Sequence, residues 1–83
     1  MHELGVTKAL FDTVMQAAKE HNAKKINDIY LVLGKGTGIE ADCVDYYFTL
    51  LAEDTLADAA KLHFLPGEPA DFYIDRMEIE ENE

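Results

Sequence analysis

The sequence is poor in cysteine and lacks tryptophan: of its 83 residues, Cys43 is the only thiol. One thiol forms neither an intramolecular disulfide nor a thiolate zinc cluster, so we expect a reducing, cytoplasmic compartment. The chain also lacks the run of about 20 apolar residues that a membrane helix needs. Glu3 stands where a secretory leader carries basic residues, so we expect the mature protein to begin as written.

Basic residues are also scarce, with 7 Lys and Arg against 17 Asp and Glu, for a formal net charge of −10. This charge repels phosphates and anionic lipids, which excludes nucleic acid and membranes as main partners. It attracts divalent cations and basic protein surfaces. With 48% hydrophobic residues the chain supports one core, and a domain this small gains stability from a metal or a partner subunit, so a homodimer is one expectation.

The first half of the chain predicts helix, strand and helix. Apolar residues recur at helical spacing over residues 5–21, and residues 26–33 form a β-branched, aromatic strand that is apolar on both faces. Three glycines within residues 34–38 predict a sharp exit from that strand. Acidic residues from Glu40 onward precede an apolar stripe that predicts a second helix ending near Ala52.

The second half predicts a hairpin. Residues 61–65 and 72–79 have the composition of strands, and the two prolines and one glycine within 66–70 predict a short hairpin turn between them. In the second of these strands Phe72 and Ile74 fall out of phase with Met77 and Ile79, which indicates a bulge or a change of buried face. Residues 80–83 are expected to fray. The order α-β-α-β-β predicts a two-layer, single α+β domain over 1–83, with two helices packed on a three-stranded sheet.

The first residues predict a metal site. The amine of Met1, the deprotonated backbone nitrogen of His2 and the His2 imidazole close two adjacent chelate rings, and this planar nitrogen set suits Ni(II) or Cu(II). Glu3, another protein group or a partner's ligand completes the fourth position. Amine and imidazole have ordinary pKa values of about 7.7 to 8.0 and about 6.5, so acid should release the metal. A histidine at position 2 also occurs by chance, without any role in metal binding.

Other polar residues have simpler interpretations. His63 alternates with core positions, as expected of a solvent-facing strand residue, and His21 stands at a helix end. Cys43 is expected to be a half-buried neighbour of the apolar stripe on the second helix. The glycine loop 34–38 lacks the spacing of a phosphate-binding loop, and no nucleophile is paired with a base, so we predict that the chain is not an enzyme.

The start Met-His-Glu-Leu, the amphipathic helix, Lys-Lys-Ile at 24–26, and the strand with its glycine-rich turn together resemble the HypA/HybF family of nickel chaperones for hydrogenase maturation. The resemblance implies that Met1, His2 and Glu3 bind nickel. It also implies two partners: a maturation GTPase and an apo-metalloenzyme such as the large subunit of nickel–iron hydrogenase. Glu40 falls near a position where family members place a carboxylate close to nickel, although an acid at a helix start explains it equally well.

The chain departs from this family in one large feature. The family carries a zinc module with two Cys-x-x-Cys pairs between its final two strands, where this chain has only residues 66–70, so we expect no structural zinc. A zinc-free paralogue and a trimmed piece both fit this difference. The sequence thus predicts a nickel metallochaperone-like protein; the alternative is a metal-free interaction module that keeps the fold and pairs through an exposed sheet edge.

Overall fold

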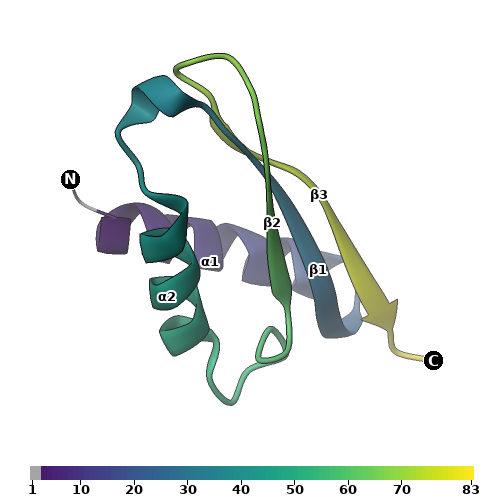
Figure 1. The fold of residues 1–83 in the computed structure, drawn as a ribbon. Helices are drawn as coiled ribbons and strands as arrows, with labels where there is room; N and C mark the ends of the chain where they lie inside the picture. Colours follow the sequence, from purple (N-terminus) through teal and green to yellow (C-terminus); the bar gives the residue numbers. More distant parts are fainter. Residues whose placement is uncertain (1–2) are drawn as a thin grey trace.

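The computed structural model describes residues 3–83 and confirms the α+β fold. Its elements are α1 (Glu3–Glu20), β1 (Ala23–Leu33), the 3-10 turn η1 (Lys35–Thr37), α2 (Ala41–Ala52), β2 (Lys61–Leu65) and β3 (Phe72–Glu81). Figure 1 shows α1 crossing behind the strands, with α2 lying against it. The predicted ranges agree with these elements to within a few residues.

The core lies between the two helices and one face of β1. Val14 of α1 and Ile29 of β1 are fully buried, and Phe48 of α2 is 2% exposed. The rings of Phe11 and Phe48 meet edge to face, 5.7 Å between centroids, which joins the two helices. Each large side chain removed from water stabilises the fold by about 1.5–3 kcal/mol. The largest fully buried side chains are Phe48, Ile26, Ile29, Leu31, Val14, Val44 and Thr7.

The strand order is β2-β1-β3, so the predicted hairpin between the last two strands is wrong. β1 pairs with β2 in parallel and with β3 antiparallel. Parallel strands need a long crossover, and α2 supplies it, which places β2 on one edge of β1 and leaves the other edge for β3. Residues 66–70 therefore cross over the end of β1 instead of turning back in a hairpin.

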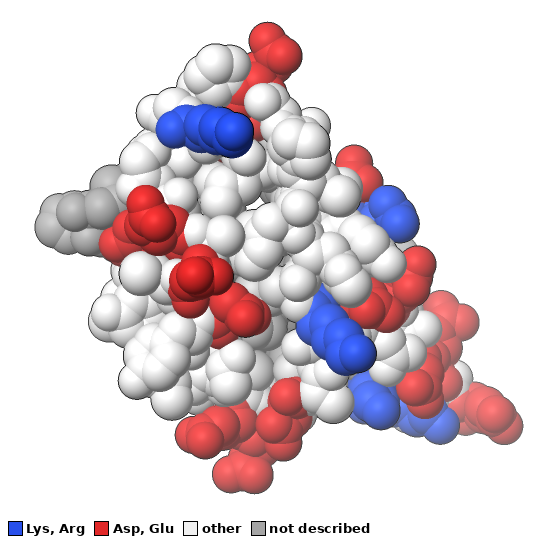
Figure 2. Space-filling model, viewed as in Figure 1, with Lys and Arg blue, Asp and Glu red and all other residues white. Residues whose placement is uncertain are grey.

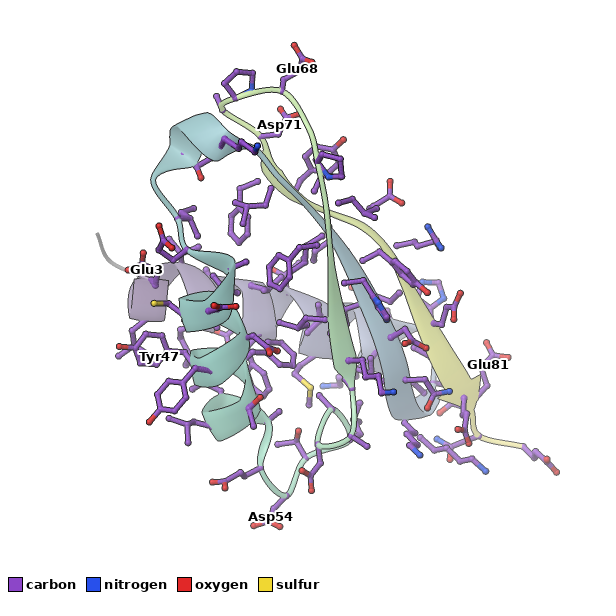
Figure 3. The ribbon with its side chains drawn as sticks, in the orientation of Figure 1. Glu3, Tyr47, Asp54, Glu68, Asp71 and Glu81 are labelled. Atoms are coloured by element: carbon purple, nitrogen blue, oxygen red, sulfur yellow. The ribbon has the colours of Figure 1, made fainter. Side chains whose placement is uncertain are left out.

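This crossing packs tightly against the glycine-rich exit of β1. The Gly34 N–H donates to the Asp71 carbonyl oxygen at 2.8 Å, and a β-carbon at Gly34 would collide with the Glu68 carbonyl oxygen. Figure 3 shows Glu68 and Asp71 together at this end of the molecule. Gly38 has a φ of 75°, a left-handed conformation that favours glycine. Gly34, one of the glycines predicted for a sharp exit from β1, thus also leaves room for the segment that crosses the end of the strand.

The phase change in β3 is a bulge, the first of the two predicted alternatives. Ile74 pairs with Leu31 and Arg76 pairs with Tyr30, so Asp75 is an extra residue on β3. The extra residue lets Ile74 and Met77 face the same side of the sheet, because their register partners Leu31 and Ile29 both belong to the core.

The predicted fraying of residues 80–83 is wrong for the first two, because β3 continues to Glu81. The Asn82 N–H then donates to the Asn22 carbonyl oxygen at 3.0 Å. Asn22 has a φ of 55°, a left-handed conformation that asparagine tolerates directly after a helix. This tie between the α1–β1 turn and the end of β3 joins residues that lie 60 positions apart.

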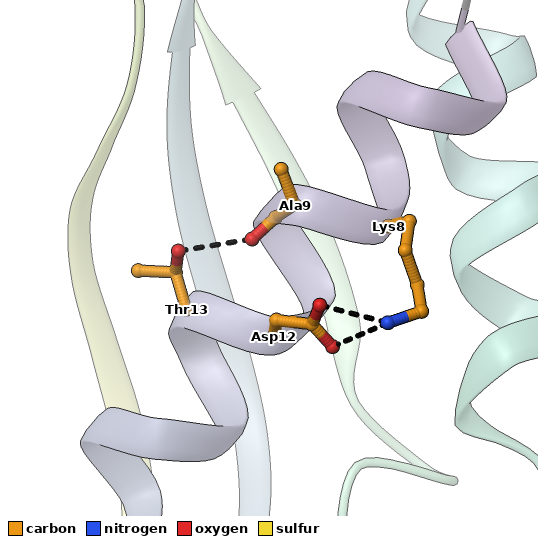
Figure 4. A network of polar contacts seen from close by, with 4 residues as sticks. All are labelled: Lys8, Ala9, Asp12 and Thr13. Atoms are coloured by element: carbon orange, nitrogen blue, oxygen red, sulfur yellow. Dashed lines mark hydrogen bonds and ion pairs between the residues drawn. The ribbon is translucent and has the colours of Figure 1, made fainter.

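The outward side of α1 carries local polar contacts (Figure 4). The Lys8 ammonium lies 2.9 and 2.7 Å from the two carboxylate oxygens of Asp12, and the Thr13 hydroxyl donates to the Ala9 carbonyl oxygen at 2.9 Å. Exposed pairs of this kind contribute about 0.3–0.5 kcal/mol. Over residues 3–83, no helix combines the length and apolar character needed to cross a bilayer.

Candidate metal centre

The starts of the two helices meet at the amino end of the described chain. Glu3 is the first residue of α1, and Glu40 immediately precedes α2. The Glu40 N–H donates to the Oε2 atom of Glu3 at 3.4 Å, and Figure 3 shows Glu3 beside the first turn of α2. A carboxylate is favoured there, because free amide groups and the helix dipole make a helix start positive. Two acids singled out from the sequence are thus neighbours.

Thr7 fixes the backbone at Glu3. Its hydroxyl donates to the Glu3 carbonyl oxygen at 2.6 Å, and the Thr7 side chain is fully buried. The first turn of α1 is therefore held by the core, although the carboxylate of Glu3 is only half-buried. Sequence reasoning missed Thr7; its signal was a threonine four residues after Glu3 on a helix, where a hydroxyl reaches back to the carbonyl of the preceding turn.

Glu40 leaves its own carboxylate uncommitted to the helix cap. Its backbone is extended, with a φ of −94°, and its side chain makes no capping hydrogen bond. Its carbonyl oxygen accepts from the N–H groups of Cys43 and Val44, both at 3.1 Å. The Thr37 hydroxyl accepts from the Ile39 N–H at 3.1 Å and so shapes the approach to Glu40. The exposed carboxylate of Glu40 is accordingly accessible to a ligand beside Glu3.

The other predicted ligands, Met1 and His2, lie outside the described residues, so their role remains a prediction. Over residues 3–83, no three His, Cys, Asp or Glu side chains come close enough together to hold a metal ion. Within residues 3–83, Glu3 and Glu40 are thus a pair of neighbouring acidic residues and not a complete ligand set.

His63 lies on the opposite face of the sheet from the helices. Its Nε2 atom is 2.8 Å from the Oδ1 atom of Asp28, and its ring stacks on Tyr30 with 4.4 Å between centroids. The guanidinium carbon of Arg76 lies 3.8 Å from the centroid of the Tyr30 ring. The sequence alone did not reveal this row of side chains, because the row depends on the strand register that pairs Tyr30 with both His63 and Arg76. Its members are Asp28, Tyr30, His63 and Arg76. His21 follows the end of α1, as expected, and is exposed.

Cys43 is exposed, so the prediction of a half-buried thiol is wrong. The buried positions of α2 are Val44, Phe48 and Ala52, spaced four residues apart. Cys43 precedes the first of them by one residue, about 100° around the helix, and this rotation turns it away from the core.

Together these features define a class of protein: a small two-layer α+β domain whose amino-end corner brings two acidic residues, Glu3 and Glu40, next to each other. Residues 1–72 match the family model described as "HypA: Hydrogenase/urease nickel incorporation, metallochaperone, hypA". The chain belongs to the HypA family, which confirms the resemblance drawn from the sequence. That description is of a metallochaperone, which agrees with the prediction that the chain is not an enzyme.

Curated relatives named hydrogenase maturation factor HypA support this membership. The protein from Caldanaerobacter subterraneus subsp. tengcongensis is 42% identical over 64 residues, covering 77% of this chain and 56% of the relative. A second, from Dehalococcoides mccartyi, is 41% identical over 70 residues, covering 82% of this chain and 59% of the relative. The chain thus spans little more than half the length of these relatives.

Two solved structures share the fold. The solution structure of the Ni metallochaperone HypA from Helicobacter pylori superposes with a TM-score of 0.72 at 24% identity, covering 81% of this chain and 58% of that one. A solution structure titled HypA protein superposes with a TM-score of 0.79 at 15% identity, covering 95% and 96% of the two chains. At these identities the likeness concerns the fold alone.

Proposed function

We propose that the chain carries one Ni(II) ion at its amino end and releases it for insertion into a metalloenzyme. The observation that carries this proposal is the match of residues 1–72 to a family of nickel-incorporation metallochaperones, which includes the Met1-His2-Glu3 start. The amine of Met1 and two nitrogens of His2 supply a planar set, and nickel favours nitrogen donors in that geometry. The metal is cargo, so an incomplete set of ligands suits its release.

The corner formed by Glu3 and Glu40 supports this assignment. The Glu3 carboxylate follows His2 directly and lies within hydrogen-bonding distance of the Glu40 backbone, so it is suited to take the fourth position around the ion. A cation there is attracted by the negative charges of both acidic residues. Glu40 then acts beside the ion, as a carboxylate that stabilises its charge or completes its coordination.

The partners follow from the family. A maturation GTPase and an apo-metalloenzyme, such as the large subunit of nickel–iron hydrogenase, are the proposed recipients of the ion in the cytoplasm. These 83 residues contain one cysteine and not the four of the family's zinc module. The proposed nickel site of this stretch therefore does not depend on structural zinc. The small size of the domain also favours pairing of two copies.

Calorimetric titration of the untagged protein with Ni(II) tests the carrier. We expect one ion per chain, with binding lost both in His2→Ala and in a version carrying extra residues before Met1, because the latter lacks the free amine beside His2. Circular dichroism of each variant checks that the fold is intact. Equal binding by all three proteins would assign the ion to scattered carboxylates and contradict the proposal.

The second candidate is a metal-free interaction module. The observation that favours it is the outer edge of β3, with which no strand of residues 3–83 pairs, because exposed strand edges pair with other chains. If the untagged protein binds no nickel while its β3 edge still takes up a partner, the interaction module replaces the carrier.

A further inference from the structure

β3 is an edge strand with one free side. The sheet order β2-β1-β3 places β1 on one side of β3, and among residues 3–83 no strand pairs with its other side (Figure 1). Alternate N–H and C=O groups of an edge strand point away from the sheet, where they are able to pair with an added strand. β3 runs for 10 residues, twice the 5 of β2, so it offers the longer edge.

An apolar groove runs beneath that edge, between α1 and β3. One hollow of about 370 Å³ is lined by Val6 and Leu10 of α1 and by Phe72 and Ile74 of β3. A second, of about 310 Å³, continues past Ile74 to Met77 and Ile79, and His21 and Arg76 give it a partly polar rim. These four β3 side chains are only half-buried, although all of them pack against the core. The helix layer thus leaves apolar surface uncovered along the inner side of the free edge.

The opposite, outer side of the same edge is acidic. Its exposed residues include Glu78 and Glu80, against the cation of Arg76, and the exposed Asp75 and Glu81 stand at the bulge and at the end of the strand. Figure 2 shows acidic side chains around the far end of β3, with basic side chains among them. One neighbouring cation is Lys25 of β1, the register partner of Glu80. Two copies of β3 placed edge to edge would bring like charges together, which disfavours a second copy as the occupant.

From these features we infer that the β3 edge binds an extended segment of another protein in which apolar and basic residues alternate. Successive side chains of an added strand point to opposite faces of the sheet. The apolar side chains enter the groove beside Ile74 and Met77, and the basic ones lie beside Glu78 and Glu80. This binding surface goes beyond the proposed nickel site and requires no metal.

The probe is a blocked decapeptide of alternating valine and lysine, added to nitrogen-15-labelled protein without nickel. We expect saturable changes in amide chemical shifts along residues 72–81 and along the part of α1 that lines the groove. A valine–glutamate decapeptide should not bind, and neither should a valine–lysine peptide methylated at alternate backbone nitrogens. Equal binding of the methylated peptide, or shifts confined to another surface, would overturn the inference.

Charge-reversal variants test the outer side of the edge. Glu78→Lys with Glu80→Lys should weaken binding of the valine–lysine peptide about tenfold, from two exposed charge pairs at about 0.7 kcal/mol each, and should strengthen binding of the valine–glutamate peptide. Glu53→Lys with Asp58→Lys changes the net charge equally in the connection between α2 and β2, and should leave the peptide preference unchanged. If both variants lost the same affinity for the valine–lysine peptide, net charge alone would explain the loss, and the inference would be overturned.

Dilution of the labelled protein tests whether a second copy of the chain occupies the β3 edge instead of another protein. If the β3 amide shifts of the free protein move with its own concentration, the edge pairs with a second copy, and the inference is wrong. Because none of these measurements contains nickel, they are independent of the carrier proposal: either one is able to fail while the other holds.

Discussion

The interior and the amino-end corner both involve α1 and α2, but they are fixed in different ways. In the interior, Val14, Val44 and Ile29 are completely buried and interlock with Phe48. At the corner, one hydrogen bond of 3.4 Å links the Glu3 carboxylate to the backbone of Glu40, and the Glu40 side chain is exposed. Packing therefore sets the shape of the domain, whereas the corner depends on the identity of a few polar groups. The two regions should respond separately to substitution.

The largest effect is expected from the interior. Phe48→Ala removes a ring that joins the two helices and should lower the free energy of unfolding by about 3–5 kcal/mol. Urea denaturation measures this. Tyr46→Ala, on the same helix and 63% exposed, should change stability by no more than about 0.5 kcal/mol. Equal losses in the two variants would show that the helices are not held by this core.

The amino end should show the reverse behaviour. His2→Ala removes a chelating ligand and should weaken Ni(II) binding at least about a hundredfold, equivalent to about 2.7 kcal/mol. Its unfolding curve without metal should coincide with that of the unchanged protein. Calorimetry and urea denaturation give the two quantities. His21→Ala, at the exposed end of α1, is the matched control and should retain nickel affinity.

Glu40 should have a smaller effect. Glu40→Gln removes one negative charge beside Glu3 while it keeps the backbone N–H that binds Glu3, so nickel affinity should fall about tenfold. Asp42→Asn, in the first turn of the same helix, removes an equal charge at a helix start and serves as the control. An identical decrease in both variants, measured by calorimetry, would mean that general electrostatics acts at the corner and that Glu40 has no particular part.

The smallest effect is expected on the opposite sheet face. His63→Ala breaks the contact with Asp28 and the stacking on Tyr30, both partly exposed, so it should lower the free energy of unfolding by about 1 kcal/mol or less. Nickel affinity should not change. A large loss of nickel affinity would instead place His63 in the metal site. Nickel binding would then not be confined to the amino-end corner.

The sequence predicted the elements because their signals are local. Helical spacing of apolar residues gave α1 and α2, and the phase change between Ile74 and Met77 gave the bulge at Asp75. Strand pairing is not local. The adjacency of the last two strands along the chain favoured a hairpin, but the crossover through α2 places β2 beside β1. A strand with two apolar faces was the only hint that β1 is central.

The corner was partly predictable. Glu3 and Glu40 were both singled out, one from the chelating start and one from a helix start, but their contact depends on how α1 packs on α2. Thr7 and the row formed by Asp28, His63 and Tyr30 were missed for the same reason: a hydroxyl or an imidazole shows its partner only when the register is known. The sequence therefore reveals types of ligand, and the fold decides which of them meet.

Locating the ion tests the account most directly. Crystals of the untagged protein grown with equimolar Ni(II) should give one anomalous peak at the nickel edge, within coordination distance of the Met1 amine and the His2 imidazole and beside Glu3. A peak at the acidic residues near the end of β3, with the first residues free of metal, would contradict it.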